Sequence, residues 1–387
     1  MRRVAVLGIG ETAMGKYPEK TLRDLILEAG TKALADAGMD RAEIQALYIG
    51  NFNGSHFCRQ SHVGPLAAET LQLGLIPAVR TEGACASGSM AFRLGYQAVA
   101  CGIYDAVLVG GVEKMTHCQT EYVTEGLATA ADADLEVPVG VTFPSVFALM
   151  ANRYFHEFGN ARDAMAWCAV QNHENALLNP DAQLKKRITV EDVKNGTPIA
   201  DPFTIYDCSL VTDGAVFAVL AESSLARSLS RKRLVEVVGC AQAGDAISMA
   251  SKNSLTTLAA TVKAANEAYI MAGLKPADID LAEVHDCFTI TEILNIEDLG
   301  FFAKGTGARA ILSGATARDG RKPINVSGGL KAKGHPIGAT GLSQIYEIVT
   351  QLRHEAGERQ VMKADIGLTH NLGGSAATCI VSIFRGR

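Results

Sequence analysis

The sequence predicts an α/β fold built from two similar halves, and three observations support this prediction. Strand-like and helix-like segments alternate along the chain. A helix-to-strand pattern from the first half recurs in the second half. The chain has 387 residues, of which 48% are hydrophobic, and this is enough for a large buried core. Alternation of this kind favours a sheet whose strands are buried by helices on both faces.

The first elements show the alternation. Residues 2–10 (RRVAVLGIG) form an apolar run that predicts a buried strand. Residues 21–38 have the periodicity of an amphipathic helix that ends at a glycine. The runs at 44–52 (IQALYIGNF) and 104–111 (YDAVLVGG) predict two further strands.

An internal repeat suggests the division of the chain. Residues 33–51 align with residues 267–286: in both, a helix ends at Ala-Gly, a short acidic turn follows, and an isoleucine leads into a strand. We therefore expect an N-terminal half at residues 1–232 and a C-terminal half at residues 233–387. Residues from about 117 to 205 have no counterpart in the second half, and we interpret them as an inserted, mostly helical segment that covers a site.

The composition argues against several classes of partner. The net charge is −5 and no basic face stands out, so nucleic acid is not expected as a partner. No apolar run reaches the roughly 18 residues that a membrane span needs, so we expect no membrane association. The nine cysteines are scattered without a Cys-x-x-Cys pair, which argues against a disulfide framework and a zinc site. We expect a cytoplasmic protein without a bound metal.

Cys85 is the first candidate catalytic residue. It follows a run of polar and small residues and directly precedes an amphipathic helix that opens at residues 86–89. The unpaired N–H groups and the dipole of a helix N-terminus favour a thiolate. Small neighbours leave room for a substrate. The alternative interpretation is a buried structural cysteine, which is the usual fate of a free cysteine.

A glycine-rich run at residues 324–341 (INVSGGLKAKGHPIGATG) contains the second candidate, His335. His335 precedes a helix and occupies nearly the same place in the second half as Cys85 does in the first. Equivalent helix N-termini can face each other in a fold with pseudo-twofold symmetry, and a cysteine nucleophile needs a neighbouring base. The alternative is a structural loop histidine.

Two later clusters contain further candidates. In EVHDCFT (283–289), His285 and Cys287 are two residues apart at the end of a predicted strand. A second cysteine could transfer protons, and a histidine could donate to a developing oxyanion. In THNLGGSAAT (369–378), Gly373 and Gly374 follow a predicted strand, and backbone N–H groups there could serve a second oxyanion hole, for which we favour Gly373. Alternatively, the two glycines could simply permit a tight turn.

Together these motifs resemble those of the thiolase superfamily. GACASGS at Cys85, HDCF at residues 285–288, GHPIGATG at His335 and HNLGG near the end occur in that family's order over nearly the full chain. The commonest thiolases have Asn-Glu-Ala-Phe in place of HDCF, and a second catalytic cysteine in the turn where this chain has HNLGG. The sterol-carrier-protein-type branch, with archaeal and bacterial acetyl-CoA acetyltransferase-like members, shows the same exchange.

The resemblance implies a fold and a reaction. The fold is two five-stranded α/β halves with an inserted loop domain. The reaction is cleavage of a 3-oxoacyl-CoA by CoA, or the reverse condensation, through a ping-pong acyl-enzyme on Cys85. Cys287 becomes the general acid and base, and His285 and His335 stabilise the enolate oxygen. CoA is a co-substrate, and no permanently bound cofactor is expected. The substrate is acetoacetyl-CoA or a bulkier 3-oxoacyl-CoA, such as an aromatic one of the benzoylsuccinyl-CoA type.

The resemblance also implies partners and a substrate pocket. Family members usually form homodimers, and many archaeal and bacterial ones work with a small zinc-ribbon, OB-fold acyl-CoA-binding subunit. In the inserted segment, His117, Phe143 and Phe147 are candidates for the acyl-pocket wall. Lys331 and Lys333 could contact CoA phosphates, but we favour a solvated loop.

Two other functions are compatible with the motifs. A ketosynthase-like condensing enzyme uses one cysteine and two histidines on the same fold, and Cys85, His285 and His335 would satisfy that set. The additional Cys287 favours a thiolase. A non-catalytic acyl-CoA-binding subunit of a complex is the second alternative, and the presence of the complete set of candidate residues argues against it.

Overall fold

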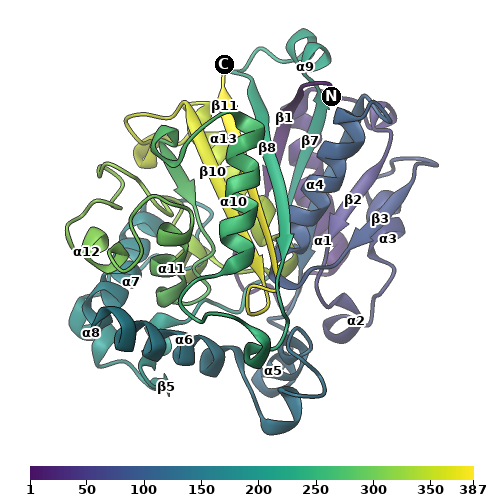
Figure 1. Cartoon of the computed structure of the whole chain (residues 1–387). Coiled ribbons are helices and arrows are strands. Elements are labelled where there is room, and N and C mark those ends of the chain that lie inside the picture. The colour runs from purple at the N-terminus through teal and green to yellow at the C-terminus, as the bar shows by residue number, and fades with distance from the viewer.

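The computed structural model describes all 387 residues and confirms the α/β class (Figure 1). The main sheet has nine strands in the order β3-β2-β4-β7-β1-β8-β11-β10-β9, and β5 and β6 form a separate two-stranded sheet. The strands are β1 (Val4–Glu11), β2 (Leu47–Gly50), β3 (Ala78–Thr81), β4 (Ala106–Glu113), β5 (Pro198–Ala200), β6 (Phe203–Thr204), β7 (Gly214–Glu222), β8 (Val235–Gly244), β9 (Leu281–Glu283), β10 (Ile366–Gly373) and β11 (Thr378–Gly386).

The strand order is the same in the two halves. The first half has the order β3-β2-β4-β7-β1, and the second half has the matching order β9-β10-β11-β8. At the place that corresponds to β3, Ile324 forms an isolated parallel bridge with Ala282 of β9. The resemblance implied five strands in each half. The first half has five strands, and the second half has four strands plus this bridge. Antiparallel pairing of β1 with β8, over Val4 to Val6, joins them.

The repeated sequence forms the same local structure twice. Helix α1 (Leu22–Ala37) ends at Gly38 with φ 60°, and helix α10 (Ala259–Ala272) ends at Gly273 with φ 64°. A short 3₁₀ turn follows in both halves and leads into β2 or β9. Glycine adopts this left-handed conformation without the strain that a Cβ would cause, which explains why Ala-Gly recurs at both helix ends.

Two helices lie at the centre of the molecule. Helices α4 (Ser87–Ala100) and α13 (Thr340–Leu352) contact each other and strands of both halves. Their apolar side chains belong to one buried cluster that also includes residues of β1, β8 and β11. At Gly88 a Cβ would lie 2.8 Å from the carbonyl oxygen of Gly338, so only glycine allows this close approach. The starts of α4 and α13 therefore meet between the halves.

The segment at 117–205 is largely helical and lies along one end of the sheet, at the bottom of Figure 1. Both chain ends lie at the opposite end of the molecule. The segment packs on the second half, because α7 contacts α11 and α12. None of the helices combines the length and hydrophobicity that a bilayer crossing requires. The remaining helices are α2 (Gly54–Phe57), α3 (Val63–Thr70), α5 (Thr120–Ala128), α6 (Phe143–Phe158), α7 (Arg162–Leu177), α8 (Val190–Lys194), α9 (Ser223–Leu229), α11 (Thr289–Asp298) and α12 (Gly307–Leu312).

Candidate active site

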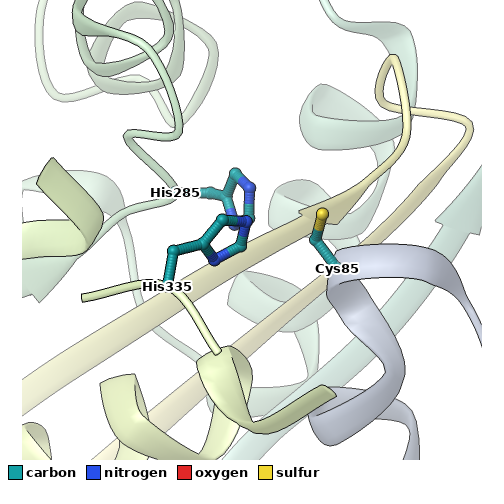
Figure 2. A group of neighbouring side chains, drawn as sticks. All are labelled: Cys85, His285 and His335. Atoms are coloured by element: carbon teal, nitrogen blue, oxygen red, sulfur yellow. The ribbon is translucent and has the colours of Figure 1, made fainter. Parts of the chain in front are cut away.

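The structure brings Cys85, His285 and His335 together at the centre of the molecule (Figure 2). One side-chain sulfur or nitrogen atom from each lies within 4.8 Å of the other two. Cys85 lies in the 3₁₀ turn before α4, His335 lies shortly before α13, and His285 follows β9. The two imidazole rings are 5.3 Å apart and nearly perpendicular, at 82°. Both halves of the chain therefore contribute to one cluster.

The cluster opens into an apolar cavity of about 150 Å³. Cys85, Cys287 and His335 line it, together with Phe143 and Phe147 of α6. The inserted segment thus covers the cavity, and the two phenylalanines lie where the sequence predicts an acyl-pocket wall.

His117 lies outside this cavity, so its prediction as a pocket wall is wrong. Its side chain is exposed, and its Nε2 lies 3.0 Å from the carbonyl oxygen of Phe57. It borders a separate surface depression that also includes Lys20 and Lys114. The physical reason is the path of the chain: Met115 lines the cavity, the chain then carries His117 to the surface, and it returns to the cavity at Leu127, Ala130 and the start of α6.

Hydrogen bonds determine which nitrogen of His335 carries the proton. Nδ1 lies 2.7 Å from Oγ1 of Thr340, and this hydroxyl donates its own proton to the carbonyl oxygen of Pro336 at 3.1 Å. With the hydroxyl proton assigned to this carbonyl oxygen, the hydroxyl accepts from Nδ1, and the ring proton is assigned to Nδ1. The lone pair is left on Nε2, the nitrogen on the Cys85 side in Figure 2. Burial lowers the pKa of His335 to about 3, so the ring is neutral and can act as a base.

His285 has the opposite arrangement. Nδ2 of Asn371 donates to Nδ1 of His285 at 3.0 Å, which places the proton of the neutral ring on Nε2. Burial lowers the pKa of His285 well below its ordinary value, and His335 and His370 lower it further. Nε2 is buried and has no hydrogen-bond partner within the protein. Its N–H therefore has no acceptor within the protein, although His285 itself is not among the residues that line the cavity. With this proton in place, the nitrogen is not a metal ligand.

Cys85 is a thiol in the free protein. Burial raises its pKa to about 12, although the backbone N–H groups of Gly374 and of Cys85 itself act in the opposite direction. The expectation of a resting thiolate is therefore wrong, because desolvation outweighs the favourable N–H groups of the helix start. The sulfur instead lies beside a neutral imidazole that can remove its proton.

The N–H groups of Cys85 and Gly374 both point at this sulfur. Gly374 lines the cavity and has φ 60°. The sequence predicted that the N–H of Gly373 contributes to the oxyanion hole, but in the structure the N–H of the next residue, Gly374, points at the sulfur. Gly373 is the last residue of β10, and a Cβ there would clash with the carbonyl oxygen of Gly83. It therefore allows the backbone before Cys85 to approach closely, while the next residue supplies the N–H.

Cys287 lines the same cavity and is buried. Burial raises its pKa well above the ordinary value, and the neighbouring Cys85 raises it further. Its sulfur lies 4.0 Å from Oγ1 of Thr291. Because this thiol keeps its proton at neutral pH, it can serve as a proton donor to a group bound in the cavity.

Buried carboxylates beside His285 hold the glycine-rich run in place. Asp286 accepts from the N–H of Leu330 at 2.8 Å. Glu283 accepts from Ser327 twice, from the N–H at 3.0 Å and from the hydroxyl at 2.6 Å. The segment that carries His285 thus also positions the run that carries His335.

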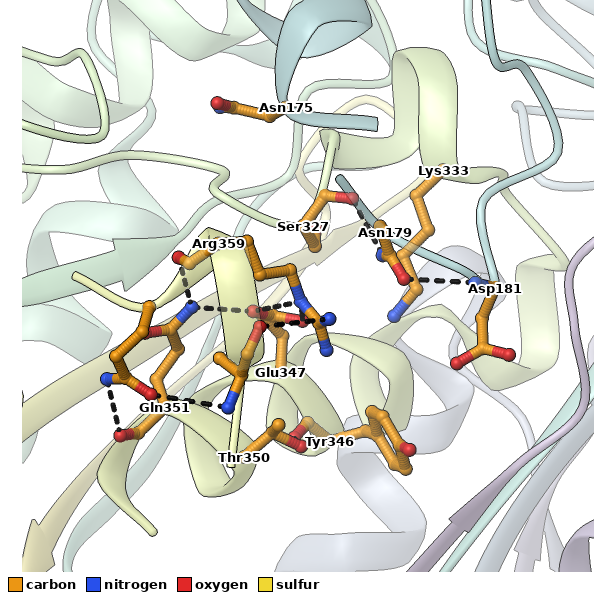
Figure 3. A network of polar contacts seen from close by, with 12 residues as sticks. Asn175, Asn179, Asp181, Ser327, Lys333, Tyr346, Glu347, Thr350, Gln351 and Arg359 are labelled. Atoms are coloured by element: carbon orange, nitrogen blue, oxygen red, sulfur yellow. Dashed lines mark hydrogen bonds and ion pairs between the residues drawn. The ribbon is translucent and has the colours of Figure 1, made fainter. Parts of the chain in front are cut away.

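The interpretation of this run as a solvated loop is wrong. Lys333 is buried and forms an ion pair with Glu11 at 2.9 Å. Lys331 is also buried, and desolvation lowers its pKa to about 8. The run packs against α7 and so has no solvated face. Figure 3 shows the surrounding polar network, which includes the buried Arg359–Glu347 ion pair at 3.0 Å.

Sequence reasoning did not identify Thr340 or Asn371 as site residues, and it named Gly374 beside Gly373 but assigned the oxyanion hole to Gly373. Thr340 lies within the quoted GATG motif, and Asn371 and Gly374 both lie within HNLGG. Their presence in these motifs was the only signal, because the contacts with the two imidazoles and with the sulfur form across the fold.

Comparisons with known proteins extend over the whole chain. Residues 4–224 match the model of the thiolase N-terminal domain, and residues 241–386 match the thiolase C-terminal domain-like model. The chain is 48% identical over 384 residues to an acetyl-CoA acetyltransferase of Methanothermobacter thermautotrophicus, covering 99% of this chain and 100% of that protein. It is 34% identical to sterol carrier protein 2 of Gallus gallus, over 98% of this chain and 71% of that protein. The solved structure "Ltp2-ChsH2(DUF35) aldolase" superposes with a TM-score of 0.85 at 25% identity, covering 98% of this chain and 97% of that chain.

Proposed function

Because this chain belongs to the thiolase family, we propose that Cys85 is the nucleophile of a CoA-dependent cleavage of 3-oxoacyl-CoA thioesters. The chain is an acyltransferase of the thiolase type, for which CoA is a co-substrate. One observation carries the assignment of the nucleophile: the Cys85 sulfur lies within 4.8 Å of a nitrogen of His335, whose unprotonated Nε2 faces it. This pairing provides a nucleophile and its base in a mostly apolar cavity.

The first half of the proposed reaction forms the acyl-enzyme. Nε2 of His335 takes the proton of Cys85, and the sulfur attacks the keto carbon of the substrate. The N–H groups of Cys85 and Gly374 stabilise the resulting oxyanion, and each such donor contributes about 3 kcal/mol. The bond between C2 and C3 then breaks, and the electron pair moves to an enolate. Nε2–H groups of His285 and His335 bind the enolate oxygen, and the Cys287 thiol protonates C2.

The second half transfers the acyl group to CoA. The Cys287 thiolate takes the proton from the CoA thiol, and the CoA sulfur attacks the acyl-enzyme carbon. The Cys85–acyl bond breaks, and the proton held by His335 returns to the Cys85 sulfur. Every group is then back in its initial protonation state. The reverse sequence is a Claisen condensation, and acetoacetyl-CoA is the reference substrate, which the name of the 48% identical relative supports.

The decisive experiment replaces Cys85 with alanine. We expect Cys85→Ala to lose nearly all acetoacetyl-CoA cleavage, because the nucleophile is gone. CoA should still bind, because the other residues that line the cavity are unchanged. Cys208→Ala is the matched control, because Cys208 lines the same cavity but takes no part in the chemistry. In the wild type, iodoacetamide should label Cys85, and acyl-CoA should protect it. Substantial turnover by Cys85→Ala would show that the nucleophile is wrong.

Cys287 distinguishes this proposal from a ketosynthase-like condensing enzyme, which needs one cysteine only. An assay of acyl-CoA against acyl-carrier protein as substrate separates the two.

We also propose a homodimer and a small acyl-CoA-binding partner subunit. The name of the similar aldolase structure, which includes a DUF35 protein, supports a search for such a partner. Light scattering of the purified chain and co-purification from its native source test both. The free cysteines support a reducing compartment such as the cytoplasm.

A further inference from the structure

The cavity at Cys85 is larger than a two-carbon acyl group requires. It encloses about 150 Å³. A dry apolar cavity of roughly this volume accommodates a benzene ring. An acetyl group on the Cys85 sulfur would leave part of this space unfilled, even with the thioester part of the substrate beside Cys287 and His335, and unfilled apolar space forfeits contacts that a larger group would make.

The wall of the cavity is aromatic and rigid. Phe288, the residue after Cys287, stacks on Phe147 with ring centroids 4.9 Å apart and on Phe203 at 5.4 Å. Phe147 and Phe203 are fully buried, so the central ring is held from both sides. These rings give the cavity a rigid apolar wall beside the reacting sulfur, and such a wall favours an apolar group that fills the space by contact.

The wall contains no cation that can pair with a carboxylate. Apart from the candidate catalytic residues, the lining is almost entirely apolar, with Ser209 as the exception. Two cations lie close to the lining residue Cys208 without lining the cavity themselves. Lys331 is buried and interacts electrostatically with Cys208, and Arg162 is engaged with the preceding Asp207 at 2.9 Å. A carboxylate at the end of the acyl chain would therefore lose its hydration without gaining a partner.

We infer that the acyl group transferred to Cys85 is uncharged and apolar and carries a branch or an aromatic ring. This inference rests on the proposed function and specifies its substrate class. Phe143, at the start of α6, is the specificity-determining residue on the accessible side of the cavity, because it is only partly buried and lacks the stacking partners of Phe147.

Two matched substrate pairs test the inference with the wild-type protein. The first pair is 3-oxohexanoyl-CoA and 3-oxoadipyl-CoA, whose chains have the same length and differ by a terminal carboxylate. We expect kcat/KM for CoA-dependent cleavage to be about 100-fold higher or more for the uncharged member. The second pair is 3-oxo-3-phenylpropanoyl-CoA and acetoacetyl-CoA. We expect the phenyl substrate to have at least the kcat/KM of acetoacetyl-CoA.

A variant pair tests the role of the wall. Phe143→Ala enlarges the cavity and should raise the kcat/KM ratio of phenyl substrate to acetoacetyl-CoA several-fold. Phe158→Ala is the matched control, since Phe158 lies on the same helix, is partly exposed and does not line the cavity. This control should leave the ratio unchanged.

The outcomes separate this inference from the proposed function. Cleavage of acetoacetyl-CoA with equal or better use of 3-oxoadipyl-CoA, or with much weaker use of the phenyl substrate, would overturn the inference and leave the function intact. If the enzyme prefers 3-oxoadipyl-CoA and this preference disappears in Lys331→Met, Lys331 is the partner of the substrate carboxylate. That outcome would also overturn the inference of an uncharged acyl group. Failure to cleave any of the four thioesters would refute the proposed function, and the inference with it.

Discussion

Replacement of Thr340 by valine tests the assignment of His335 as the base for Cys85. Valine keeps the shape of threonine but removes the hydroxyl that accepts from Nδ1 of His335. The Nδ1–H then has no acceptor in a buried site. The ring gains a partner only by rotating or by moving its proton to Nε2, and either change removes the lone pair that faces the sulfur.

The expected loss follows from the cost of a buried donor without a partner. That cost is about 1–3 kcal/mol. Since about 1.4 kcal/mol corresponds to a factor of ten in rate, kcat should fall about 5- to 150-fold. Thr340→Ser keeps the hydroxyl and should retain most of the activity. Because acetoacetyl-CoA binding does not depend on the tautomer, KM should change much less than kcat.

Two measurements check this prediction. The first is steady-state cleavage of acetoacetyl-CoA by wild type, Thr340→Val and Thr340→Ser. The second is the rate of Cys85 alkylation by iodoacetamide at fixed pH, which reports removal of the thiol proton and which a purely structural role of Thr340 would leave unchanged. The reasoning fails if Thr340→Val stays within about twofold of the wild type in both.

Three further predictions follow from the buried groups. Cys287→Ala should slow the exchange of solvent deuterium into C2 of acetyl-CoA by about 100-fold or more, because the proton donor is lost. Alkylation of Cys85 should continue in this variant. Unchanged exchange would exclude Cys287 as the general acid and base. The rate of Cys85 alkylation should rise steadily from pH 5 to 8, because the thiol pKa of about 12 lies above this range. The imidazole of His335 has a pKa of about 3 and stays neutral throughout it. A plateau in the rate would instead indicate a thiolate–imidazolium pair. Arg359→Ala should lower the free energy of unfolding by about 3–5 kcal/mol in urea titrations, because it leaves the Glu347 carboxylate buried without its partner; a loss below about 1 kcal/mol would contradict this.

Local sequence patterns predicted the elements that carry the site. The periodicity of residues 21–38 and the glycine after it specified α1 and its end, because a helix and its cap depend on neighbouring residues. The same pattern at Gly273 revealed the repeat of the two halves. The repeat placed Cys85 and His335 before equivalent helices, and the structure brings these two residues together.

The sequence by itself determined the order of the elements, the repeat and the identity of the residues that meet at the centre. Only the tertiary structure decided their chemical state. Burial makes Cys85 a thiol despite its helix N-terminus, and it places Lys331 and Lys333 in the interior. Contacts across the fold select the tautomers of the two histidines and bring Gly374, rather than its neighbour, to the sulfur. Desolvation and hydrogen bonds depend on everything that surrounds a group in space, and a linear sequence does not specify those neighbours.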